Sequence, residues 1–243
     1  MGVRSRTFWV VFLVMLVLVM VISVIAGAVF LQGAKANGEI QAFQHLNRAC
    51  DAIKREVRIL DDVVTDYASW DDSYAFIQDK NETFVRTNFV DETFDKNRFT
   101  DFLILNNDGE ILFQKGYNAQ KQTEMPISNG LLGLLKDSPS LVQHTSVEHS
   151  ASGVVLLSNK LFMISSHPVL TSNYTGPVRG SMIATRAMDS KLIEELSELL
   201  HMPCELLLIG HESSMNVQDV YALKKLTINM PMCVETNNQH IMY

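Results

Sequence analysis

The stretch TDFLILNNDGEILFQKGY, Thr100 to Tyr117, decides the fold class because it contains every part of a β-hairpin. The apolar run Phe102–Leu105 favours one strand, and a second strand starts at Ile111. Between them, Asn107-Asp108-Gly109 supplies the residues that tight turns prefer. Two short strands joined by such a turn predict an antiparallel sheet.

Further strands are expected toward the C-terminus. The stretch GVVLLSNKLFMISSHPVL, Gly153 to Leu170, predicts a second hairpin with its turn at Ser158-Asn159-Lys160. In GPVRGSMIATRAM, a fifth strand is expected over residues 180–187. The sheet is therefore predicted to hold two hairpins and one more strand.

Helices alternate with these strands. ISNGLLGLLKDSPS predicts a short amphipathic helix that ends before Pro139, and DSKLIEELSELL predicts a helix whose N-cap is Asp189 or Ser190. The order of strands and helices predicts an α+β domain, a PAS-like antiparallel sheet with flanking helices, over residues 67–200. Residues 201–243 are expected to form a C-terminal extension.

A long helix is expected before the sheet, because Ile40 to Ile77 contains neither glycine nor proline. Apolar residues recur there at alternating steps of three and four, which is a seven-residue repeat. We expect a long helix over residues 32–66, with a seam that can serve in dimerisation. Its apolar seam either makes a homodimer or packs on the chain's own domain. The seam consists of Phe43, Leu46, Cys50, Ile53, Val57, Leu60, Val64 and Tyr67.

Residues 8–31 form an uncharged apolar run that predicts a transmembrane anchor. As a helix it spans about 36 Å, enough for a hydrocarbon core of about 30 Å. A cleaved signal peptide ending near Ala34-Lys35-Ala36 is the competing interpretation, but the run is too long for it. Arg4 and Arg6 place residues 1–7 in the cytoplasm by the positive-inside rule. The main domain is then periplasmic or extracellular, on a single-pass protein of the plasma (inner) membrane.

Net charge and cysteine content limit the classes of partner and of covalent cross-link that we expect. All 27 acidic residues lie beyond the apolar run, so the outer part is acidic and nucleic acid is not an expected partner. The three cysteines, Cys50, Cys204 and Cys233, are too few for a disulfide framework, although an extracytoplasmic compartment would permit one disulfide bond.

The segment DYASWDDSYAFI, residues 66–77, combines aromatic rings with carboxylates. If it is one helix, Tyr67, Trp70, Asp71 and Tyr74 share a face. Asp71 then occupies a seam position and needs a partner, a capping role or a wet cavity. The alternatives are a break near Ser69 that places Asp71 at the start of a new helix, or a solvated carboxylate.

Catalytic chemistry is not expected, because no hydrolase, phosphate-loop or metal-protease motif occurs. Asp71 and Asp72 point about 100° apart on a helix, which disfavours a hydrolase acid/base pair. His144 and His149 are five residues apart in a polar loop and are not expected to bind a metal. No catalytic residue, metal or cofactor is therefore expected.

The sequence resembles the fourth class of CHASE domains, extracytoplasmic sensors of histidine kinases and diguanylate cyclases. Three stretches carry the resemblance: Asp66–Ile77, Asp101–Phe113 and Ser152–Met188. They lie in the order and at the spacing that the family shows, and the likeness covers about Asp51 to Leu200.

By position, the resemblance assigns several residues to family motifs. Trp70, Asp71 and Tyr74 match its W-D-x-x-Y element, and Asn88 matches a downstream asparagine. Gly176, Arg179 and Gly180 match its G-x-x-R-G segment. We expect Trp70, Asp71, Tyr74, Asn88 and Arg179 to bind an unknown small-molecule signal, with Arg179 as counter-charge to Asp71. A structural brace in which Asp71 caps a loop is the alternative.

The resemblance implies a membrane-anchored sensor that detects a small-molecule or environmental signal and transmits it through its helix. Family members continue into a second membrane helix and a kinase or cyclase module, whereas the stretch after Leu200 holds no long apolar run. Two alternatives follow: the sequence is a truncated reading frame, or the output lies on a separate signalling protein. A ligand-free structural tether that dimerises through its helix is the competing function.

Overall fold

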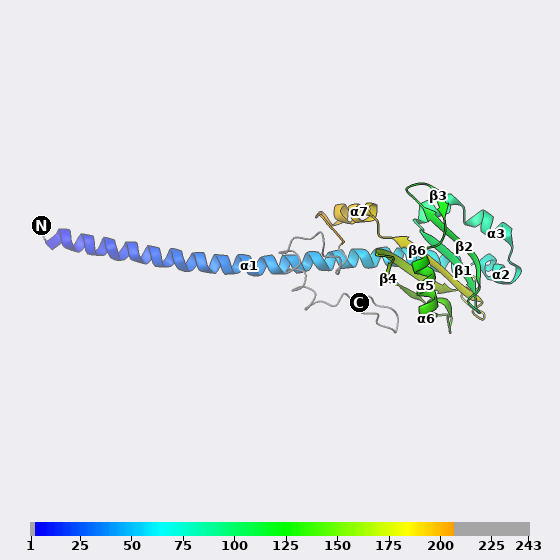
Figure 1. Ribbon diagram of the computed structural model, residues 1–243. Helices are drawn as coiled ribbons and strands as arrows, with labels where there is room; N and C mark the ends of the chain where they lie inside the picture. Colours follow the sequence, from blue (N-terminus) through cyan, green and yellow to red (C-terminus); the bar gives the residue numbers. More distant parts are fainter. Residues whose placement is uncertain (1–2, 207–243) are drawn as a thin grey trace. The chain divides into compact units, whose positions relative to one another are not determined.

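The computed structural model of the protein describes residues 3–206 (Figure 1). The chain divides into two units, Met1–Asp51 and Ala52–Tyr243. Helix α1, Val3–Ala68, begins in the first unit and ends in the second. Most of the expected C-terminal extension, including Cys233, lies outside the described residues.

The described part of the first unit, residues 3–51, belongs to α1. Its segment Phe8–Phe30, 23 residues long, is apolar and long enough to cross a membrane, and it is the one such segment found within residues 3–206. This agrees with the expected N-terminal apolar helix.

The second unit is built on one antiparallel six-stranded sheet with the strand order β3-β2-β1-β6-β5-β4. Both predicted hairpins and the predicted fifth strand are present. The prediction of five strands was nevertheless one short, because β3 extends the sheet beyond β2. The strands are β1 Asp101–Asn106, β2 Ile111–Asn118, β3 Thr123–Met125, β4 Ala151–Leu157, β5 Lys160–Pro168 and β6 Gly180–Ala187.

The two hairpin turns have the backbone that their residues favour. Gly109 has a φ of 79°, in the left-handed region that glycine adopts without strain. Ser158 and Asn159 both have positive φ, at 49° and 62°, as a two-residue turn between twisted strands requires. The turn residues therefore fix the register of both hairpins.

Alternate residues of the central strands pack on opposite faces of the sheet. Phe102 and Ile104 belong to the apolar cluster shared with the end of α1, whereas Leu103 and Leu105 belong to a second cluster on the other face. Helices α2 Asp71–Asp79, α3 Glu82–Asn88, α4 Asp91–Asn97 and α7 Ser190–Leu200 contribute to the first cluster. Helices α5 Asn129–Asp137 and α6 Pro139–Val142 cover the other face (Figure 1).

The apolar seam of α1 packs on the chain's own domain within the second unit. Leu60 and Val64 are completely buried, and Ile53, Val57 and Tyr67 pack partly buried against the same core. From Ile53 to Tyr67, the seam therefore packs on the chain's own domain, which was the alternative to a homodimer. Leu46, in the first unit, is 40% exposed.

Helix α7 begins where the sequence indicated. The Asp189 carboxylate accepts a hydrogen bond from the Leu192 amide at 3.0 Å, so Asp189 rather than Ser190 is the N-cap. The buried residues Leu192 and Leu196 attach α7 to the core.

Candidate functional site

The aromatic and acidic segment does not form one helix. Helix α1 ends at Ala68 and α2 starts at Asp71, with Trp70 between them in an extended conformation. The structure therefore shows the predicted alternative, a break near Ser69. The prediction that Tyr67, Trp70, Asp71 and Tyr74 share one face of a single helix was wrong. The Ser73 hydroxyl donates to the Tyr67 carbonyl at 2.6 Å, which replaces a helical hydrogen bond at the break. Asp71 lies in the first turn of α2, where a negative charge is favourable.

Trp70 belongs to the core rather than to an open site. Its ring lies 4.6 Å from the ring of Tyr67, centroid to centroid, and it packs half-buried against the main apolar cluster. Tyr67 in turn contacts the rings of Phe89 and Phe102. The indole therefore closes one end of an aromatic cluster.

Asp71 holds the β5–β6 loop, residues 169–179. Its carboxylate accepts hydrogen bonds from the Ser172 amide at 3.0 Å and from the Ser172 hydroxyl at 2.5 Å. These two hydrogen bonds lower the pKa of Asp71, because they favour the ionised form. Both residues are exposed, so the contact lies at the surface.

Tyr74 and Arg179 make the second attachment of this loop. The Arg179 guanidinium lies 3.6 Å above the centre of the Tyr74 ring and donates to the Tyr74 carbonyl at 3.1 Å. The Tyr74 hydroxyl donates to the Pro177 carbonyl at 3.2 Å. Within residues 3–206, Asp71 takes part in no ion pair, so Arg179 serves the tyrosine and not the carboxylate.

Asn88 forms its hydrogen bonds at the end of α3. Its side-chain amide donates to the Phe84 carbonyl at 2.9 Å, and its own carbonyl accepts from the Thr93 hydroxyl at 2.8 Å. These contacts connect α3 with α4. The structure thus brings Asp71, Tyr74 and Arg179 together around the β5–β6 loop, while Trp70 packs in the core and Asn88 bonds elsewhere.

A cleft of about 820 Å³ lies between helices α3 and α4 and strands β2 and β3. The aromatic rings of Phe89, Phe113 and Tyr117 line it, together with four carboxylates and two basic side chains. Lys115, whose side chain is 11% exposed, donates to the Asp91 carboxylate at 2.7 Å and to the Phe89 carbonyl at 3.1 Å. Sequence reasoning missed this cleft, although Lys115 and Tyr117 alternate on β2 and so share one face of the sheet.

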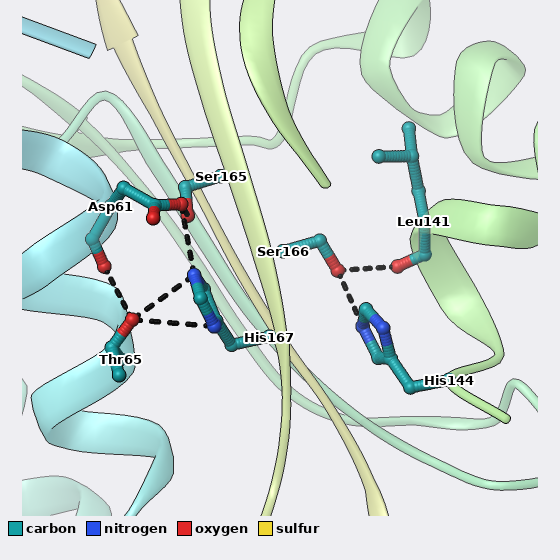
Figure 2. Close-up of polar contacts among 7 residues, drawn as sticks. All are labelled: Asp61, Thr65, Leu141, His144, Ser165, Ser166 and His167. Atoms are coloured by element: carbon teal, nitrogen blue, oxygen red, sulfur yellow. Dashed lines mark hydrogen bonds and ion pairs between the residues drawn. The ribbon is translucent and has the colours of Figure 1, made fainter. Parts of the chain in front are cut away.

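A partly buried polar cluster joins α1 to strand β5 (Figure 2). The Asp61 carboxylate accepts hydrogen bonds from the Ser165 hydroxyl and the His167 Nε2, both at 2.8 Å. The Thr65 hydroxyl donates to the Asp61 carbonyl at 2.8 Å and lies 3.1–3.2 Å from both ring nitrogens of His167. Burial would raise the pKa of Asp61, but hydrogen bonds from His167 and Ser165 and the charge of His167 outweigh it and lower that pKa.

A second polar group lies on the other face of the same strand (Figure 2). The Ser166 hydroxyl donates to the Leu141 carbonyl at 2.6 Å, so it accepts from the Nε2–H of His144 at 3.0 Å. His144 Nδ1 then accepts from His149 Nδ1 at 2.9 Å. Burial lowers the pKa of His144 to about 4, and the charges of His149 and His167 add to this effect.

The sequence carried a weak signal for both groups, since Ser165-Ser166-His167 interrupts an otherwise apolar strand. Its long-range partners, Asp61 and His144, could not be assigned without the fold. Within the described residues, no group of three or more histidine, cysteine, aspartate or glutamate side chains has the arrangement of a metal site.

Comparisons with protein families and with single known proteins both relate this chain to sensor-type proteins. The family model described as "CHASE4 domain" matches residues 52–207. The chain is 28% identical over 148 residues to the methanogenesis regulatory histidine kinase FilI of Methanothrix harundinacea (strain 6Ac). That alignment covers 60% of this chain and 16% of the relative, so the chain corresponds to a small part of the relative's length.

Two solved structures resemble the fold. The extracellular domain of vpHK1S-Z8, assigned as a histidine kinase, aligns with a TM-score of 0.50 at 14% identity, over 84% of this chain and 85% of that one. A domain of a sensory box/GGDEF family protein from Vibrio parahaemolyticus aligns with a TM-score of 0.49 at 13% identity, over 84% and 89%.

The family match spans more than half of the chain, and it contains the helix break, the β5–β6 loop and the whole sheet. The sequence resemblance and the family model thus agree on the same segment. The chain belongs to the CHASE4 domain family, which is related to the sensor modules of histidine kinases.

Proposed function

We propose that the chain is a membrane-anchored extracytoplasmic sensor that detects a small molecule and passes the signal through α1 to an output of the kinase or cyclase type. One observation carries this proposal. The helix that contains the membrane-length segment Phe8–Phe30 also contains Leu60 and Val64, which are completely buried in the sensor core. A change in the packing of that core therefore acts directly on the helix that leads to the membrane.

We place no catalytic activity in this chain. The hydrolase alternative needs Asp71 as a free acid or base, whereas both of its carboxylate oxygens accept hydrogen bonds from Ser172. The relation to sensor modules of histidine kinases supports a sensory rather than a catalytic role.

The cleft between α3–α4 and β2–β3 is the proposed binding site for the small molecule. Its volume of about 820 Å³ is within the usual range for small-ligand pockets, and it combines aromatic rings with polar groups that can orient a ligand. Trp70, Asp71, Tyr74 and Arg179 then act as a brace for the β5–β6 loop instead of contacting the ligand. Asn88, next to the lining residue Phe89, holds the corner between α3 and α4.

A metabolite screen tests this proposal by the melting temperature of the full chain in detergent micelles. A compound that binds the folded state at about 100 times its Kd stabilises it by about 2.7 kcal/mol. We expect Glu92→Gln with Glu124→Gln, both in the cleft, to abolish the rise in melting temperature. The exposed Glu148→Gln, outside the cleft, is the matched control and should keep it.

Two results would count against the sensor. A rise that survives the cleft substitutions would move the ligand site elsewhere. A wild-type chain that responds to no compound would favour the structural tether, for which the bracing contacts of Asp71 and Arg179 are the supporting observation.

A further inference from the structure

The cluster around Asp61 is a polar contact between α1 and the sheet, as is the ion pair of Glu56 with Arg186 at 3.4 Å. Residues 60–65 of α1 supply the apolar residues Leu60 and Val64 and the polar residues Asp61 and Thr65. The side chains of His167 and Asp61 are only 12% and 25% exposed. A charged pair in this position is screened much less by salt than a surface pair.

The charged and titratable groups that face His167 can be named for each neighbouring element. Helix α1 supplies Asp61 at 2.8 Å, and β4 supplies the uncharged Ser152, which also bonds the Asp61 carboxylate. On β6 the residue paired with His167 is the apolar Met182. Across the strand, His144 is close enough for the charge of His167 to lower its pKa, and His149 lies behind it.

The geometry points to a proton-responsive latch: Asp61 and His167 fasten α1 to strand β5, firmly when His167 carries a proton and loosely when it does not. The latch itself depends only on these contacts. Its regulatory meaning, that pH biases the signal carried by α1, rests on the function proposed above.

The direction of the effect follows from the two titrations. The pKa of Asp61 is lowered in the folded protein, so its contribution to stability is present above the unfolded pKa of about 3.9 and is lost as pH falls through the lower folded value. Histidine side chains change charge between about pH 5 and 8. A protonated His167 makes a charged pair with Asp61, and a neutral His167 leaves the carboxylate without a positive partner.

Losing the charge weakens the latch without removing the packing beneath it. A neutral His167 still donates from Nε2 to the ionised carboxylate, but the attraction between the two opposite charges is lost. Leu60 and Val64 remain buried. We therefore expect α1 to stay on the sheet at higher pH and to open locally more often.

A double-mutant cycle on the full chain in detergent micelles tests the latch. The variants are Asp61→Asn, His167→Gln and both together, measured by unfolding at pH 5.5 and pH 8.5. His167→Gln keeps a donor but cannot be charged. We expect the coupling constant to be about tenfold larger at pH 5.5 than at pH 8.5. His201→Gln, at the exposed end of α7, is the matched control and should show no coupling to Asp61.

A measurement on the wild-type chain keeps the test valid if a variant does not fold. Amide hydrogen exchange in residues 57–67, corrected for the intrinsic effect of pH, should be slower at pH 5.5 than at pH 8.5. Equal coupling at both pH values, or exchange without pH dependence, would overturn the latch. If the ligand response fails while the pH-dependent coupling persists, the sensor function is rejected and the latch stands. If the ligand response is present while the coupling does not depend on pH, only the latch is rejected.

Discussion

Two glycines in the β5–β6 connection stand where any larger residue would collide. A Cβ atom on Gly180 would lie 2.0 Å from the Leu105 carbonyl oxygen, and one on Gly176 would lie 2.9 Å from the Tyr74 hydroxyl oxygen. Arg179, between them, covers the Tyr74 ring. The G-x-x-R-G motif is therefore explained by contacts that fasten the loop to β1 and α2.

Gly176→Ala should destabilise the domain. Gly176 has a φ of 98°, which an alanine adopts only with strain, and the added methyl group also meets Tyr74. We expect a loss of about 1–3 kcal/mol, measured as the free energy of unfolding. Gly133→Ala, in α5 with nothing within 4 Å of the added atom, is the control and should be neutral or stabilising by up to about 1 kcal/mol. Equal effects of the two substitutions would contradict the strain argument.

Single residues were the hardest part to predict from the sequence. The pattern identified Trp70, Asp71 and Tyr74 as unusual, but the partner of Asp71 is Ser172, 101 residues away. A carboxylate on an apolar face fits a pocket, a cap or a solvated position equally well as long as its hydrogen-bond partner is unknown. The same limit hid Asp61 and His167, whose residue types are common at exposed helix and strand positions.

At the scale of elements, prediction succeeded where local chemistry decides structure. The hairpin turns carry residues that accept positive φ, and the strands beside them alternate or are continuously apolar. Strand β3 has neither signal: Thr123 and Glu124 are exposed, and its pairing depends on Gly116, where the backbone of Met125 approaches to 2.6 Å of a Cβ position. Such an edge strand is set by its neighbour and not by its own sequence.

The seam of α1 shows why a periodic pattern does not name its partner. The same repeat suits a coiled coil and packing on a sheet, and the structure assigns Leu60 and Val64 to the sheet. The repeat continues to Leu46 and Cys50, in the first unit. We propose that the membrane-proximal half of the seam makes the homodimer.

Mild oxidation should therefore cross-link two chains through Cys50. In a parallel dimer, the same seam residue of both helices lies next to the axis, so the two thiols approach each other. The measurement is the fraction of disulfide-linked dimer on a non-reducing gel for full chains in membranes, with Cys204 and Cys233 replaced by serine. Cys50→Ser is the control. Absence of a cross-link, together with a monomeric mass at high concentration, would exclude this interface.

At the scale of the whole molecule, the proposed function places the apolar segment Phe8–Phe30 in the membrane and the second unit in water. The acidic residues all follow the apolar segment, and the chain belongs to a family related to the sensor modules of histidine kinases. The segment Phe8–Phe30 has the length and composition of a membrane span. Arg4 and Arg6 are the features that set the direction of insertion in this proposal.

A pair of topology reporters tests that direction. Alkaline phosphatase is active only outside the cytoplasm and green fluorescent protein only inside, so we expect a fusion after Leu200 to be active with the phosphatase and dark with the fluorescent protein. Replacing Arg4 and Arg6 by glutamate removes the positive charges that hold the N-terminus inside, and this variant should lose a large part of the phosphatase activity. Strong fluorescence from the unmodified fusion would place the CHASE4 domain in the cytoplasm. The proposed sensor of external signals would then be wrong, whereas the latch between Asp61 and His167 would remain as a property of the folded domain.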